Sequence, residues 1–150
     1  MATTLDFTIA LSIDRILESV YATSAAEHIT ADTEQPAILG TAHEAMLRSI
    51  CRDVIAGLIF AIAPEVADTN IDDSSADDII EIHLAQDPRY INIHLLRRSF
   101  EITAAAGVLS VVWKSNKPEL SASWRKSYDE SCTCLLDLIR RGPEKILPTS

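Results

Sequence analysis

Residues 87–113, DPRYINIHLLRRSFEITAAAGVLSVVW, decide the fold expected for this chain. Apolar side chains recur through this stretch at three- and four-residue intervals, which is the spacing of one helix face. Asp87 can cap such a helix, and Pro88 suits its first turn because proline has no amide hydrogen to leave unpaired. The four consecutive small residues at 104–107 would let another helix approach closely. The stretch therefore predicts a long helix that ends at Trp113 and packs against another helix.

Two further helices are predicted before this one. Ser12 can cap a helix that runs to about Ala26, and the polar stretch 27–36 then indicates a loop. Thr41 and Glu44 have the spacing of a capping box, and the apolar series that follows them continues until Pro64.

A last helix is predicted from Pro118, with apolar residues at helical intervals up to Gly142-Pro143. Residues 142–150 would then form a C-terminal tail. Residues 1–11 read as an N-terminal strand or arm, because apolar and polar residues alternate from Leu5 to Leu11. The same alternation at 80–84 predicts a second strand that pairs with the first.

The segment between these elements, residues 65–78, reads EVADTNIDDSSADD and is too polar to contribute to a core, so it predicts a long acidic loop. Together these patterns predict a mainly α fold. It would consist of about four helices in a bundle-like arrangement, a small two-stranded β element and the acidic loop, all within one domain of 150 residues.

Charge is distributed unevenly along the chain. The net charge of −9 combines a balance of −13 over residues 1–87 with a balance of +4 over residues 88–150. The acidic first half argues against tight non-specific nucleic-acid binding, which needs clustered Lys and Arg. A two-signed surface instead favours contact with copies of the same chain or with another charged protein. The residues expected at such an interface are Arg97, Arg98, Arg125 and Arg140 on one side, and Asp72, Asp73, Asp77 and Asp78 on the other.

Catalytic and metal-binding patterns are not evident, so we expect neither a cofactor nor a metal. His28, His43, His83 and His94 show no ligand spacing, and the glycines are isolated. Cys132 and Cys134 are two residues apart on a helix, so their side chains point about 200° from each other and cannot easily hold one metal. Packing of a buried thiol is expected for at least one of them.

No secretory signal precedes the three cysteines, and the most apolar stretch, 54–63, is about half the length of a membrane helix. The expectation is synthesis in the cytoplasm without a membrane span.

The order of these elements resembles a known family. An N-terminal segment ending in SIDRILESVYATSA, the helix TAHEAMLRSICRDVI, the strand DIIEIHL, then LLRRSFEITAAAGVLSVVWKSNKPEL and the terminal WRKSYDES are similar to small head–tail connector, or adaptor, proteins of tailed phages. Such proteins occur in phages and prophages of gut bacteria, including crAss-like phages.

The resemblance implies a non-enzymatic virion protein made in the host bacterial cytoplasm. It would form a ring of about twelve copies in the neck, joining the portal to the tail around DNA that passes without sequence-specific binding. The alternative is a cytoplasmic α-helical regulatory protein that dimerises through the small residues at 104–107.

Overall fold

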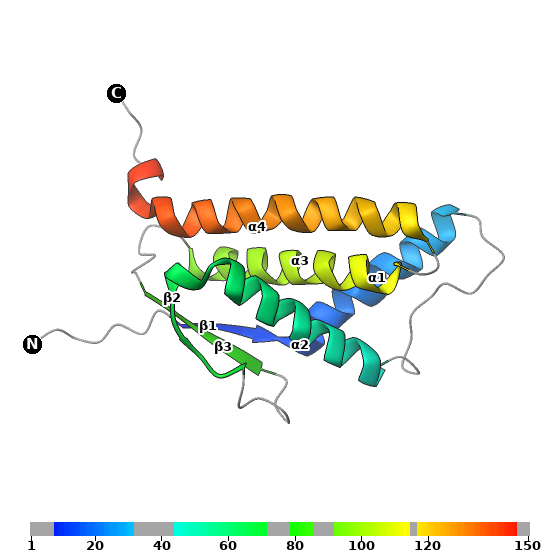
Figure 1. Cartoon of the computed structure of the whole chain (residues 1–150), viewed down its shortest axis with the longest axis horizontal. Coiled ribbons are helices and arrows are strands. Elements are labelled where there is room, and N and C mark those ends of the chain that lie inside the picture. The colour runs from blue at the N-terminus through cyan, green and yellow to red at the C-terminus, as the bar shows by residue number, and fades with distance from the viewer. Residues whose placement is uncertain (1–7, 32–43, 72–78, 86–91, 115–116, 147–150) are drawn as a thin grey trace, which may run out of the picture.

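A computed structural model describes residues 8–31, 44–71, 79–85, 92–114 and 117–146 of this chain. Its elements follow the order β1 (Thr8–Ser12), α1 (Ile13–Ala31), α2 (Glu44–Ala61), the 3-10 helix η2 (Ala63–Glu65), β2 (Val66–Thr69), β3 (Ile79–Leu84), α3 (Ile93–Val112) and α4 (Pro118–Ile146). The mainly α prediction is confirmed, with four α-helices in the described residues (Figure 1).

The β element has three strands, so the prediction of two was wrong. β3 lies in the centre and pairs antiparallel with β1 on one edge and β2 on the other. The predicted pairing of the first strand with 80–84 is confirmed, with Leu11 opposite Ile80. The missed strand, β2, occupies part of the predicted acidic loop, because the second edge of β3 offers unpaired backbone groups that even a short polar segment can satisfy. Asp72, Asp73, Asp77 and Asp78 lie outside the described residues.

One face of the sheet packs under the helices. Ile9 and Leu11 of β1 and Ile80 and Ile82 of β3 are buried, while the residues between them are more exposed, as expected for a sheet with one covered face. Figure 1 shows α4 on the far side of α3 from this sheet, and α1 and α2 slanting across α3. The helices therefore form layers above a sheet, and a simple bundle is not confirmed.

The first two helices begin close to where the sequence places them. The backbone amide of Arg15 donates to Ser12 Oγ at 3.3 Å, which confirms Ser12 as the cap of α1. The helix continues to Ala31, so the loop predicted from residue 27 begins later than expected. α2 begins at Glu44 and ends at Ala61, and Pro64 lies inside η2. Thr41, the other half of the predicted capping box, is outside the described residues.

The long helix α3 is confirmed, but its start was misplaced. Asn92 is its cap, because its side-chain oxygen accepts hydrogen bonds from the amides of His94, at 2.8 Å, and Leu95, at 3.4 Å. Trp113 ends the helix as predicted. The proposed start at Asp87-Pro88 lies outside the described residues.

α3 and α4 form a helical hairpin around Trp113, which is 2% exposed. Lys117 lies over the Trp113 ring at 5.3 Å, and the Ser121 hydroxyl donates to the Ser110 carbonyl. α4 begins at Pro118 as predicted, but it continues through Gly142-Pro143 to Ile146, so the predicted tail at 142–150 was placed too early. A proline inside a helix removes one backbone hydrogen bond and crowds the carbonyl four residues earlier, which bends some helices without ending them.

Candidate functional site

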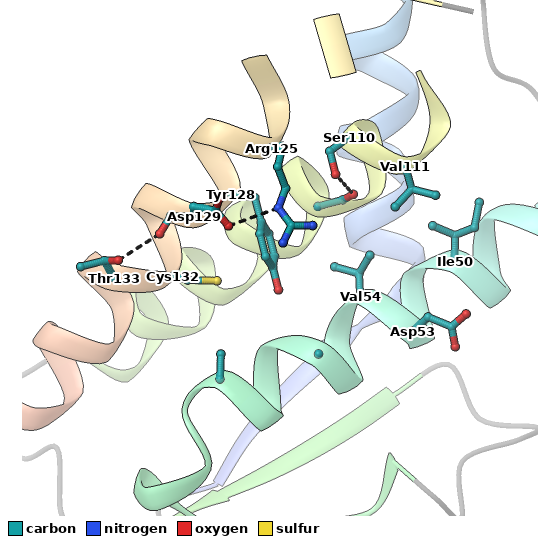
Figure 2. A pocket seen from close by; sticks show the side chains of 13 residues that line it. Ile50, Asp53, Val54, Ser110, Val111, Arg125, Tyr128, Asp129, Cys132 and Thr133 are labelled. Atoms are coloured by element: carbon teal, nitrogen blue, oxygen red, sulfur yellow. Dashed lines mark hydrogen bonds and ion pairs between the residues drawn. The ribbon is translucent and has the colours of Figure 1, made fainter. Parts of the chain in front are cut away.

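A groove of about 640 Å³ lies between α2 and α4, with α3 as its floor. We call it the α2–α4 groove. Figure 2 shows Tyr128 reaching from α4 toward α2 across this space, with Val54 and Asp53 on the facing helix. The lining residues are Ile50, Asp53, Val54, Gly57, Ala61, Gly107, Ser110, Val111, Arg125, Tyr128, Asp129, Cys132 and Thr133.

Gly107 is what allows α2 and α4 to approach α3 at the floor of this groove. A Cβ atom at Gly107 would lie 2.6 Å from Val54 Cγ1 and 2.9 Å from Tyr128 Cδ1, closer than real contacts allow. The prediction that the small residues at 104–107 admit a close helix is therefore confirmed within the chain. All four residues are buried there, so this run offers no free surface for the dimer contact that the regulatory alternative places on it.

The polar groups of the α2–α4 groove are partly paired. Arg125 contacts Asp129 at 3.3 Å and lies over the Tyr128 ring at 5.6 Å. Burial, together with a hydrogen bond that the Tyr128 hydroxyl donates to Cys132, raises the pKa of Tyr128 above its usual range. Burial also raises the pKa of Cys132. Both groups therefore stay protonated at neutral pH, which makes them packing and hydrogen-bonding groups rather than activated nucleophiles.

A second, shallower groove of about 390 Å³ runs between α3 and α4. We call it the α3–α4 groove. It presents Leu95, which is 67% exposed, and Ile102, which is 49% exposed, between the polar side chains of Arg98 and Glu130. The remaining lining residues are Ser99, Thr103, Ser127, Ser131 and Cys134.

A buried carboxylate joins α1 to α3. Glu101 is 2% exposed and lies 3.2 Å from Arg15 Nε and 3.7 Å from Arg98 Nη1. Its two oxygens accept no hydrogen bond of good geometry from the described residues, so these two ion pairs provide its compensation. Glu18 also borders the surface hollow beside these arginines, which leaves the cluster without an excess of positive charge.

The predicted interface arginines are not all equally accessible. Arg98, Arg125 and Arg140 have side chains that are 54%, 67% and 53% exposed. Arg97 is half-buried on α3, and its Nε is buried without a hydrogen-bond partner among the described residues. The structure therefore places three of the four on the surface and spreads them along α3 and α4. The acidic partners named from the sequence fall outside the described residues.

Cys132 and Cys134 lie apart on α4, and His43 lies outside the described residues. Cys132 lines the α2–α4 groove and Cys134 the α3–α4 groove, since residues two apart face opposite sides of a helix. Cys132 is half-buried and Cys134 exposed, so the prediction that at least one of these two thiols is buried was wrong. His83 lies on a strand, where its Nδ1 is 2.7 Å from Thr8 Oγ1, and His94 lies exposed at the start of α3.

Phe60 is a surface residue that the sequence reading missed. It is 82% exposed on α2. The helical periodicity of the sequence could have shown this, because Phe60 lies off the helix face that carries the buried residues Leu47, Cys51, Ile55 and Leu58. The two grooves could not be found in this way, since each combines side chains from different helices.

The described residues contain neither a metal-binding cluster nor a membrane-spanning helix. They hold no group of three or more His, Cys, Asp or Glu side chains suited to a metal ion. None of their helices combines the length and the apolar character that a membrane span requires. Comparisons with family models, with curated proteins and with solved structures give no match to this chain.

Proposed function

We propose that this chain is the subunit of a ring in the neck of a tailed phage, where it joins the portal to the tail around the DNA channel. The proposal begins from the resemblance of the sequence to head–tail connector proteins. The observation that carries it furthest is the set of exposed arginines on α3 and α4, since a ring subunit needs one surface that pairs with a different surface of the next copy.

Among the described residues, each of these arginines pairs with one carboxylate, Arg98 with Glu101, Arg125 with Asp129 and Arg140 with Glu65. The Arg125 pair with Asp129 spans 3.3 Å, and the Arg140 pair with Glu65 spans 3.9 Å. A guanidinium group has five N–H donors, so most of the donors on both side chains remain available to carboxylates of another copy. The acidic first half of the sequence supplies such carboxylates. Electrostatic complementarity of this kind sets the register between subunits more than it sets raw affinity.

The test is electron microscopy of the purified protein, alone and mixed with the portal protein encoded nearest to it, at low and moderate salt. We expect closed rings of about twelve copies, alone or only on the portal. The double variant Arg125→Glu/Arg140→Glu should reduce the fraction of protein found in rings. Lys114→Glu reverses an exposed positive charge in the turn after α3 and should leave that fraction unchanged.

A chain that stays monomeric with and without the portal would contradict the proposal. A discrete dimer that ignores the portal would favour the regulatory alternative. If the double variant and Lys114→Glu form rings in equal amounts, Arg125 and Arg140 do not contribute to the contact between subunits.

A further inference from the structure

We propose that Phe60 of one copy packs into the α3–α4 groove of the next copy, so that a second copy of this chain is the partner of both surfaces. This inference rests on the proposed function and specifies how the ring closes. It starts from two apolar surface features on different elements: a single projecting aromatic side chain on α2, and a shallow apolar groove between α3 and α4.

Phe60 has the properties of an interface anchor. It is 82% exposed, far more than any other large apolar side chain on α2. Phe60 follows the buried Leu58 by two residues, so the two side chains point roughly 200° apart around the helix. Phe60 therefore points away from the core that α2 covers. Aromatic residues are enriched in the buried centres of interfaces because they bury a large area with few rotatable bonds.

The α3–α4 groove has the properties of a receptor for such a side chain. Its floor and edge carry the exposed apolar residues Leu95 and Ile102, seven residues apart on the same face of α3. Polar groups surround them, with Arg98 at one rim and Glu130 at the other. An apolar centre with a polar rim is the usual anatomy of a protein–protein contact.

The two features lie on different surfaces of the molecule. Gly107 of α3 faces α2 and α4, because a side chain there would meet Val54 and Tyr128. Ile102 precedes Gly107 by five residues, which turns it roughly 140° away from that direction. Ile102 thus points away from α2. Phe60 follows Val54, which faces α3, by six residues, so its side chain is turned roughly 120° away from α3.

Phe60 and the α3–α4 groove lie on different surfaces, and this decides which kind of assembly their contact can form. A two-fold dimer joins the same surface on both copies, whereas a contact between two different surfaces is heterologous and repeats from copy to copy until a ring closes. Asp53 is exposed on α2 two turns before Phe60, at the rim of the α2–α4 groove, and the α3–α4 groove offers it Arg98 as an opposite charge and Glu130 as a like charge.

Cys134 makes the contact directly testable, because it is exposed and lines the α3–α4 groove. A Phe60→Cys variant, oxidised gently and run on a non-reducing gel, should give a ladder of covalent dimers, trimers and higher species. The ladder should survive Cys132→Ser and disappear with Cys134→Ser, both in the Phe60→Cys background. Wild-type protein, treated in the same way, is the reference for background crosslinking.

Two arginine substitutions on α3 provide a matched pair for the unlinked protein. Ile102→Arg places a charge in the α3–α4 groove, and Ile93→Arg places one at the start of α3 among neither set of groove-lining residues, at side chains that are 49% and 36% exposed. Ile102→Arg should weaken self-association by about tenfold or more, as loss of an interface anchor does, and Ile93→Arg by less than about twofold. Analytical ultracentrifugation measures both.

The outcomes separate this inference from the function on which it rests. Rings that form normally but give no Cys134-dependent ladder would overturn the Phe60 contact and leave the proposed function standing. A single covalent dimer that depends on Cys132 would overturn this inference and show that Phe60 docks in the α2–α4 groove of a two-fold partner. A chain that never associates, alone or with the portal, would overturn both.

Discussion

α3 and α4 lie side by side along most of their length, yet they occupy different environments. α3 contacts α1, α2, α4 and the sheet strand β1, and eleven of its residues are buried. α4 covers α3 from outside, and its side chains described as buried are Ser121, Leu135 and Ile139. A helix buried on most sides loses the clear polar and apolar faces that mark an outer helix. We therefore expect the loss of stability on substitution to depend on how many elements surround a residue, and not on the length of its helix.

The largest difference should separate two phenylalanines. Phe100→Ala removes a fully buried ring of α3, and we expect the free energy of unfolding to fall by about 3 to 5 kcal/mol. Phe60→Ala removes a ring that is 82% exposed, so stability should change by less than about 0.5 kcal/mol. Urea unfolding followed by circular dichroism measures both variants. Similar losses would mean that α3 is not the centre of the core.

Substitutions at two glycines should change stability by intermediate amounts. Alanine at Gly107 would meet Val54 Cγ1 at 2.6 Å, and the overpacking should outweigh the gain in helix propensity, leaving a net loss of about 1 to 2 kcal/mol. Gly57→Ala is the matched control. Its nearest neighbour, Tyr128 Oη, is 4.0 Å away, so propensity should prevail and stability should rise by about 0.5 to 1 kcal/mol. If the melting temperatures of both variants move in the same direction, the close packing of Val54 and Tyr128 against Gly107 is contradicted.

The smallest effect should come from the outer surface of α4. Arg125 and Asp129 are paired at 3.3 Å with side chains 67% and 61% exposed, so Arg125→Ala should lower stability by only about 0.3 to 0.5 kcal/mol. A double-mutant cycle with Asp129→Ala isolates the pair, and its coupling should shrink further in about 1 M salt. A salt-independent coupling above about 1 kcal/mol would show that this pair is buried in the folded protein.

Local chemistry predicted the starts of α1 and α4 but not their ends, whereas for α3 it predicted the end at Trp113 and misplaced the start. Ser12 and Pro118 start α1 and α4 as expected, because a cap or a first-turn proline acts on backbone groups within a few residues. Gly142-Pro143 did not end α4, and the polar stretch after Ala26 did not end α1 at that point. Termination depends on whether propagation of a formed helix is still favourable, and that varies with its length and packing.

β2 and the grooves show what local chemistry leaves open. Val66–Thr69 is too short and polar to indicate a strand, and it pairs because β3 is beside it, with a register shift between Val66 and Asp68. The α2–α4 groove similarly joins residues of α2 to residues of α4 that lie more than sixty positions later. Such sites have no spacing that could be read along the chain.

The sequence by itself determined that this protein is mainly helical, where its main helices and two of its three strands lie, and that four small residues of α3 admit a close neighbour. These features follow from periodicity and backbone capping, which act over one or two turns. The tertiary structure alone shows that α2 and α4 both meet Gly107, that Glu101 is buried between two arginines, and that Phe60 and Ile102 are exposed. The physical reason is that burial and surface shape depend on which elements become neighbours, and packing of the whole chain selects those neighbours.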